Sequence, residues 1–197
     1  MSLDEEVRAL RDRGEAEAAA TRAIKALGPE ILGYLGALLH DAGEASEVFS
    51  QFAEDLWRGL PAFRFESSLR TWAYKLAWHA ASRFARDPYR RRRERLETTL
   101  ASRLAEHLLS SAGRSVERRA AEVGRLRQYL SPEEQTLLVL RVDRRLAWRE
   151  VAEVLGGEGG DGEPGGGGPP DEVALRKRFE RLKEKLARAA REEGLLE

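Results

Sequence analysis

Hydrophobic residues recur every three or four positions along most of the chain, and this spacing predicts amphipathic α-helices. No stretch alternates hydrophobic and polar residues as a half-buried strand would. The predicted fold is therefore all-α. We expect two small helical domains joined by a linker, the second a helix-turn-helix with an enlarged glycine-rich turn.

The clearest amphipathic pattern covers 67–95 and predicts a helix that ends at Asp87-Pro88, because proline disfavours helical geometry in the residue before it. Its core side consists of Leu69, Ala73, Leu76, Ala77, Ala80 and Phe84. The opposite side, which we call the basic aromatic face, consists of Trp72, Lys75, His79, Ser82, Arg83 and Arg86, and four arginines follow at 90–93. Cations beside an indole suit a nucleic-acid strand, since cations contact phosphates and the ring stacks on a base. A solvated arginine-rich helix with a half-buried tryptophan is the alternative.

Three more helices are predicted before this one. The first covers 3–27 and ends at Gly28-Pro29, the second covers 30–40, and the third covers 44–57. The third has a core face of Ala45, Val48, Phe49, Phe52 and Leu56. Its opposite face carries an acidic stripe made of Glu44, Glu47, Gln51 and Glu54. This stripe is either ordinary solvent-facing surface or a docking site for a basic protein element.

Apolar spacing weakens at 96–114, which predicts a linker, and a helix is expected again at 115–129. Ser131-Pro132-Glu133-Glu134 is a strong helix start, with an N-cap serine and a glutamate three residues later. It opens a short helix at 133–141, and a second short helix is predicted at 147–155. The glycine- and proline-rich run at 156–170 is predicted to be a mobile insertion. It is no phosphate-binding loop, because no strand precedes it and no Gly-Lys-Ser/Thr closes it.

The last predicted helix, which Asp171 caps, has one narrow apolar stripe made of Leu175, Phe179, Leu182 and Leu186. The cations around that stripe are Arg176, Lys177, Arg178, Arg181, Lys183, Lys185 and Arg188. Two short helices followed by a basic amphipathic helix are typical of a helix-turn-helix that binds DNA. A solvated C-terminal helix would have the same spacing.

Charge is balanced overall but unevenly distributed. Lysine plus arginine and aspartate plus glutamate number 34 each, so the net charge is zero. Residues 44–55 are acidic, whereas 83–95 and 176–191 are strongly basic. Separated blocks of charge favour a protein that contacts both a basic and an acidic partner. Ordinary surface charge, in a chain that is 35% charged, is the alternative.

Catalytic and metal-binding chemistry finds no support in the sequence. Cysteine is absent, and the histidines His40, His79 and His107 stand in unrelated contexts without metal-ligand spacing. We therefore expect no enzyme, no cofactor and no metal site. The N-terminal residues lack the apolar core of a signal peptide, and no apolar run approaches the ~20 residues that span a bilayer. A cytoplasmic protein without membrane insertion is expected.

The ordered motifs together resemble bacterial RNA polymerase sigma factors of the extracytoplasmic-function type, in the sigma-70 family. The first domain of that family carries a motif like D-A-E-D-L-V-Q-E-V-F-L-R-A-W, then a leucine and a phenylalanine, then a helix like T-W-L-Y-R-I-A-x-N. The corresponding residues here are 44–57 (EASEVFSQFAEDLW), Leu60, Phe63 and 71–79 (TWAYKLAWH). The second domain typically has L-x-x-E-x-R, E-I-A-x-x-L-G and T-V-K-S-R-L-x-R-A-R-x-x-L, which correspond to 130–135, 150–156 and 175–186. The family's glutamine in the first motif is Ser50 here, and the asparagine at the end of its tryptophan motif is His79.

This resemblance implies a function without covalent chemistry: binding core RNA polymerase, recognising and melting promoter DNA, and starting transcription. It implies a domain at 1–95 that binds polymerase and the minus-ten promoter element, a linker at 96–114, and a domain at 115–197 that binds the minus-thirty-five element. Polymerase would dock on Glu44, Glu47, Gln51 and Glu54. Minus-ten DNA would meet Trp72, Lys75, His79, Ser82, Arg83, Arg86, Arg90 and Arg91. Minus-thirty-five DNA would meet Arg176, Lys177, Arg178, Arg181 and Lys185.

Other functions stay open at this point. One alternative is a stand-alone helix-turn-helix regulator that binds duplex DNA but not polymerase. Another is an all-α adaptor with no nucleic-acid role. The expected partners are core RNA polymerase and promoter DNA, and an anti-sigma factor is a further candidate.

Overall fold

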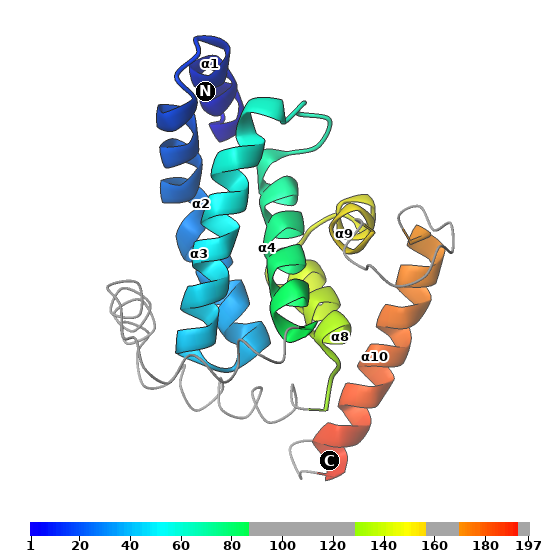
Figure 1. The fold of residues 1–197 in the computed structure, drawn as a ribbon. Helices are drawn as coiled ribbons and strands as arrows, with labels where there is room; N and C mark the ends of the chain where they lie inside the picture. Colours follow the sequence, from blue (N-terminus) through cyan, green and yellow to red (C-terminus); the bar gives the residue numbers. More distant parts are fainter. Residues whose placement is uncertain (87–128, 157–169, 193–197) are drawn as a thin grey trace. The chain divides into compact units, whose positions relative to one another are not determined.

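The computed structural model of the protein describes residues 1–86, 129–156 and 170–192, and these residues are helical without any strand (Figure 1). They belong to two compact units, one containing 1–86 and the other containing 129–156 and 170–192. The predicted all-α fold with two helical domains is thereby confirmed. The linker at 96–114, the helix at 115–129 and the glycine-rich turn at 156–170 lie almost wholly outside the described residues, so the domain boundaries stay predictions.

The first unit consists of α1 (Leu3–Asp12), α2 (Ala16–Leu39), α3 (Ala42–Gly59), a 3₁₀ turn η1 (Leu60–Ala62) and α4 (Leu69–Arg86). Its core is built from the apolar stripes of these helices. The largest fully buried side chains are Ile31, Tyr34, Leu35, Phe52, Leu56, Leu60, Leu69 and Tyr74. Packing of these stripes supplies most of the stability of such helices, since a helix of this length is marginal alone in water.

The prediction of one continuous helix over 3–27 is wrong, because the helix is interrupted at Gly14. This glycine has φ of 79°, in the left-handed region that only glycine adopts without strain. The Gly14 N–H donates to the Arg11 carbonyl at 2.8 Å, and the Glu15 N–H donates to the Leu10 carbonyl at 3.0 Å. This pair of hydrogen bonds is the Schellman pattern that closes a helix C-terminus.

The end predicted at Gly28-Pro29 is also wrong, because α2 continues through Pro29 to Leu39. An interior proline removes one backbone hydrogen bond and disfavours the helix by about 3 kcal/mol. Burial offsets this cost here, since Leu27, Gly28 and Ile31 are all buried in the core. The lack of a side chain at Gly28 also lets the Phe49 ring pack closely against α2, because a Cβ at this position would lie 3.3 Å from that ring.

Helices α3 and α4 agree with the sequence patterns. Asp41 caps α3 by accepting the Glu44 N–H at 2.8 Å, and the predicted core positions Ala45, Val48, Phe52 and Leu56 are buried, while Phe49 is half-buried. In α4 the buried core positions are Leu69, Ala73, Ala77, Ala80 and Phe84. Leu76, predicted on the core side, is only half-buried.

The second unit consists of α8 (Pro132–Leu138), a π-helical turn η2 (Val139–Asp143), α9 (Trp148–Leu155) and α10 (Glu172–Glu192). The predicted capping box is present. The Ser131 Oγ accepts the Glu134 N–H at 3.2 Å, and the Glu134 carboxylate accepts the Ser131 N–H at 2.8 Å. Asp171 caps α10 as predicted, accepting the Val173 N–H at 3.2 Å. Leu175 and Leu182 of the α10 stripe are buried, and Phe179 and Leu186 are half-buried.

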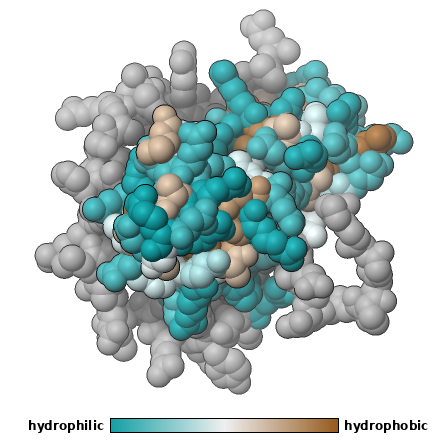
Figure 2. Space-filling view, turned by 90° about the horizontal axis from the view of Figure 1, so that it is seen from above, coloured by the Kyte–Doolittle hydropathy of each residue, from teal (hydrophilic) through white to brown (hydrophobic). Residues whose placement is uncertain are grey.

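Hydrophilic side chains predominate among the described residues visible in Figure 2, and hydrophobic ones form small patches. The large hydrophobic side chains exposed in the described ranges are Met1, Trp57, Tyr129, Val142 and Val173. None of the described helices is both long enough and apolar enough to span a bilayer.

Candidate nucleic-acid interface

Trp72, the aromatic residue of the basic aromatic face, is half-buried on α4. Its ring stacks on Phe63, with ring centroids 4.4 Å apart and 15° between the planes. Its edge lies over Gly59, where a Cβ would come within 3.0 Å of the Trp72 Cζ2 atom. One face of the indole is therefore covered by protein, and only the remaining part of the side chain is available to a base.

The cations of the basic aromatic face differ in their hydrogen-bond and ion-pair partners. Lys75 is half-buried and makes no hydrogen bond or ion pair with any residue in the described ranges. Arg83, in contrast, forms a hydrogen-bonded ion pair with Asp55 of α3. The Arg86 Nε donates to the Ser82 carbonyl at 3.2 Å. Arg90 and Arg91 lie outside the described residues.

His79 lies among these cations and is half-buried. Its Nε2 atom is buried and has no hydrogen-bond partner among the residues that the structure describes. Burial lowers the pKa of His79, and the nearby Lys75 and Arg83 lower it further, while Asp55 opposes them. The imidazole is therefore neutral near pH 7, with one nitrogen able to donate and the other able to accept. Such a group suits the edge of a base better than the charge of a phosphate.

The acidic stripe lies on the solvent side of α3. Glu44, Glu47 and Gln51 are half-buried, and Glu54 is exposed and pairs with Arg58 at 2.6 Å. The Gln51 Nε2 donates to the Asp55 Oδ1 at 3.0 Å.

A cleft of about 300 Å³ runs between α3 and α4, lined by Glu47, Val48, Gln51, Asp55, Ala80, Arg83 and Phe84. Part of the acidic stripe and one end of the basic aromatic face therefore meet at this cleft. Asp55 links them and was missed by the sequence analysis. Its position four residues after Gln51, on the same side of the helix, is the signal that would have identified it.

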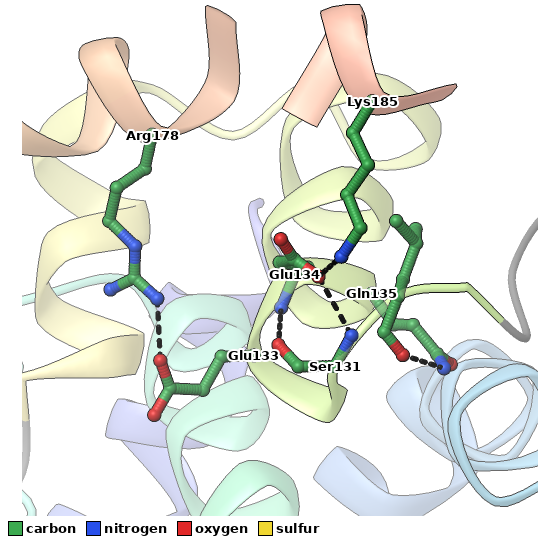
Figure 3. A network of polar contacts seen from close by, with 7 residues as sticks. Ser131, Glu133, Glu134, Gln135, Arg178 and Lys185 are labelled. Carbon is green, nitrogen blue, oxygen red and sulfur yellow. Dashed lines mark hydrogen bonds and ion pairs between the residues drawn. The ribbon is translucent and has the colours of Figure 1, made fainter. Parts of the chain in front are cut away.

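The cations of α10 also differ in their partners (Figure 3). Arg178 pairs with Glu133 at 2.5 Å, and the Lys185 Nζ lies 2.8 Å from the Glu134 Oε2, so both hold α10 against the first turn of α8. Burial tends to raise the pKa of Glu134, but hydrogen bonds from Lys185 and from the Ser131 backbone more than offset this, and the pKa is lowered.

The remaining predicted cations of α10 are exposed. Arg176 lies 3.5 Å from Glu172 and has its guanidinium 5.9 Å from the centre of the Trp148 ring. Lys177 and Arg181 form no ion pair within the described part of the chain. The side of α10 that is open to an anionic ligand therefore includes Lys177 and Arg181.

Trp148 was also missed by the sequence analysis. Its ring packs edge-on against Phe179, with centroids 5.6 Å apart, and the Arg141 guanidinium lies 4.8 Å from its centre. These contacts fix the start of α9 against α10. A lone tryptophan at the start of a short helix carries no periodic signal for such a role.

Two comparisons with known proteins fit this arrangement. Residues 23–94 match the family Sigma-70 region 2, and this stretch contains both the acidic stripe and the basic aromatic face. The chain is also similar to the RNA polymerase sigma factor YlaC of Bacillus subtilis (strain 168), with 29% identity over 133 residues, which are 64% of this chain and 73% of that protein. The resemblance to sigma factors inferred from the motifs is thereby confirmed, and the chain contains a Sigma-70 region 2 domain at 23–94.

Proposed function

We propose that this chain is a sigma factor of the extracytoplasmic-function type that binds core RNA polymerase and directs it to promoters, where it opens the DNA. One observation carries the proposal. The stretch 23–94 that matches sigma-70 region 2 holds an acidic stripe on α3 and an aromatic, basic face on the neighbouring α4.

The acidic stripe is the proposed polymerase-docking surface. Glu44, Glu47, Gln51 and Glu54 follow one side of α3 over about three turns. A row of carboxylates and an amide on a rigid helix suits a basic helical element of a partner, because complementary charges steer association and fix its register. The family resemblance indicates the coiled-coil of the largest polymerase subunit as that element.

The basic aromatic face is the proposed minus-ten site. Lys75 and Arg86 would contact phosphates of the separated strand, and the open part of Trp72 would contact an unstacked base. Each stacked base contributes about 1–3 kcal/mol, which helps to hold the strands apart. The neutral His79 would contact a base edge through its Nδ1, because its Nε2 is buried. Arg83 would have to leave Asp55 before it could bind a phosphate.

Helix α10 is the proposed minus-thirty-five reader. A recognition helix in the major groove contacts bases and phosphates with the side that its own domain leaves open. Lys177 and Arg181 are the best candidates, because both are exposed and neither is held by a described carboxylate. Arg178 and Lys185 would have to exchange Glu133 and Glu134 for DNA.

Reconstitution with core RNA polymerase tests the whole proposal. Adding the full chain to core enzyme should yield promoter-specific transcripts from a genome-wide template set. The absence of any specific transcript would refute the proposal. DNA binding without polymerase binding would instead indicate a stand-alone regulator.

A charge reversal tests the docking surface separately. Glu47→Lys combined with Glu54→Lys should abolish co-purification with core enzyme, because two carboxylates of the stripe become cations. The control is Glu17→Lys on α2, which reverses one exposed carboxylate away from the stripe. Equal retention of the double variant and the control on core enzyme would exclude the stripe as the docking surface.

A further inference from the structure

Helix α1 contacts the segment 63–68 that connects η1 to α4. The Arg11 guanidinium donates a hydrogen bond to the Phe63 carbonyl. The Asp4 carboxylate accepts the Leu69 N–H at 3.1 Å, which is one of the free donors at the start of α4. Two side chains of α1 thus hold both ends of this segment.

The ring of Phe65 lies between these two ends and is also contacted by α1. The guanidinium groups of Arg8 and Arg11 lie 4.6 and 4.8 Å from the centre of this ring, within the range of cation–π contacts. Phe65 has φ of 56°, a left-handed conformation that a bulky residue adopts only when its surroundings impose it. Arg8 and Arg11 of α1, together with the Phe63 ring, are the described contacts of the Phe65 ring.

The aromatic contacts continue from this segment to Trp72. The Phe65 and Phe63 rings have centroids 4.6 Å apart, and Phe63 stacks on Trp72 at 4.4 Å. The ring that we propose as the base contact is therefore supported through Phe63 by the segment that α1 holds. Packed rings move together, because protein interiors leave little free volume.

Helix α1 is itself fixed to the unit. Val7 is fully buried, and Arg22 of α2 pairs with Glu6 at 2.8 Å. A capping box between Ser2 and Glu5 closes its N-terminus. This helix precedes the stretch 23–94 that matches sigma-70 region 2, so that match assigns it no role.

We propose that α1 positions the single-strand site, with Asp4 and Arg11 as positioning residues that act on Trp72 through the segment 63–68. This inference rests on the proposed function of Trp72 in promoter opening. Without these contacts Phe65 loses the partners that hold its left-handed conformation, the Phe63 ring loses its support, and Trp72 samples several orientations. The consequence is a loss of base preference at the separated strand rather than a loss of all DNA binding.

The test uses full-length chain assembled with core polymerase and a library of promoters with a randomised minus-ten region. The base preference of opened promoters is compared among wild type, Arg11→Met and Arg13→Met. Methionine keeps the unbranched stem but removes the hydrogen bond to Phe63 and the cation. Arg13 is the matched control, because it is exposed, pairs with Glu15 and contacts no residue of the segment 63–68 among the described contacts.

We expect Arg11→Met to reduce about tenfold the ratio of promoter opening between the best and the worst base at the melted positions. The affinity for the upstream duplex should stay unchanged. Arg13→Met should match wild type. A preference profile of Arg11→Met that equals wild type would overturn the inference. Thermal unfolding is measured alongside, since a purely structural role would lower the unfolding temperature and leave the profile unchanged.

Asp4→Ala provides a second variant that removes the acceptor for the Leu69 N–H. It should flatten the preference profile in the same direction, and an unchanged profile in this variant would also count against the inference. Failure of the proposed function would look different, because wild-type holoenzyme would then open no promoter of the library.

Discussion

Arg178 is expected to exchange its carboxylate partner for a DNA phosphate, and replacing Glu133 by Gln tests this exchange. In the second unit the Arg178 Nη2 lies 2.5 Å from the Glu133 Oε2. If α10 reads DNA, this ion pair competes with binding. Removing the carboxylate should therefore strengthen DNA binding, whereas the loss of a merely structural pair would weaken or preserve it.

The magnitude follows from the exposure of the pair. The Arg178 and Glu133 side chains are 43% and 56% exposed, so the pair stabilises the fold by at most about 1 kcal/mol. A carboxylate about 4 Å from a phosphate in water is repelled by about 1 kcal/mol. Relief of the competition is thus expected to raise DNA affinity by about fivefold. The salt dependence of binding should also become steeper, by up to ~0.9 in the slope of log K against log salt. In the wild type, the Glu133 carboxylate takes up a cation when Arg178 leaves it for DNA, and this uptake cancels part of the counterion release.

Fluorescence anisotropy with a labelled upstream duplex measures both quantities between about 50 and 200 mM salt. The matched control is Glu153→Gln on α9, which removes one carboxylate that forms no ion pair with a described residue. Any general effect of net charge appears in this control as well. Affinity and salt slope of Glu133→Gln equal to those of the control would show that Arg178 does not contact DNA.

Three further predictions concern the first unit. Trp72→Ala should slow promoter opening, measured by permanganate reactivity of unpaired thymines, far more than it weakens duplex binding; equal losses would contradict its role. Glu30→Gln should lower the free energy of urea unfolding by about 1–3 kcal/mol, because one Glu30 oxygen accepts from both Arg70 and the Tyr74 hydroxyl. The exposed control Glu54→Gln should lose less than about 1 kcal/mol. Because the pKa of His79 is lowered from 6.5, the folded protein binds fewer protons there than the unfolded chain, and stability should fall as the pH drops below 6.5. His79→Asn should remove this part of the acid loss in urea unfolding, and an undiminished loss would contradict the assignment.

The helices with strong periodicity could be predicted from the sequence, and the helix breaks could not. The alternation of core and polar positions placed α3 and α4 nearly at their observed bounds. Pro29 is a local signal for a helix end, but the buried residues around it outweigh that signal, and burial is a property of the tertiary fold. Gly14 ends α1, although Gly28, Gly33 and Gly36 lie within α2 without ending it. Only the backbone angle at each glycine distinguishes these cases.

Residue types of the candidate site could also be predicted, but their pairing could not. Periodicity assigned Arg83, Arg178 and Lys185 to basic faces, and all three are on the helices expected. Their carboxylate partners come from other helices, 28 to 51 residues away in the sequence. Asp55 illustrates the difficulty, since its spacing from Gln51 places it on the side of the acidic stripe but does not reveal its ion pair with Arg83 of α4.

The cations proposed to bind DNA include two groups that contribute differently to affinity. Arg83, Arg178 and Lys185 each form an ion pair with a carboxylate of a neighbouring helix, whereas Lys75, Lys177 and Arg181 have no such partner among the described residues. A paired cation is already oriented, but it exchanges a protein carboxylate for a DNA phosphate. Its net contribution to the free energy of DNA binding is therefore small. An unpaired cation contributes its full counterion release, at ~0.9 per phosphate in the salt slope. With zero net charge, the chain as a whole has little long-range attraction to DNA, so binding by the described residues should depend on their few unpaired cations and on base contacts. The number of unpaired cations, rather than the total number of arginines and lysines, should therefore set the salt dependence of promoter binding.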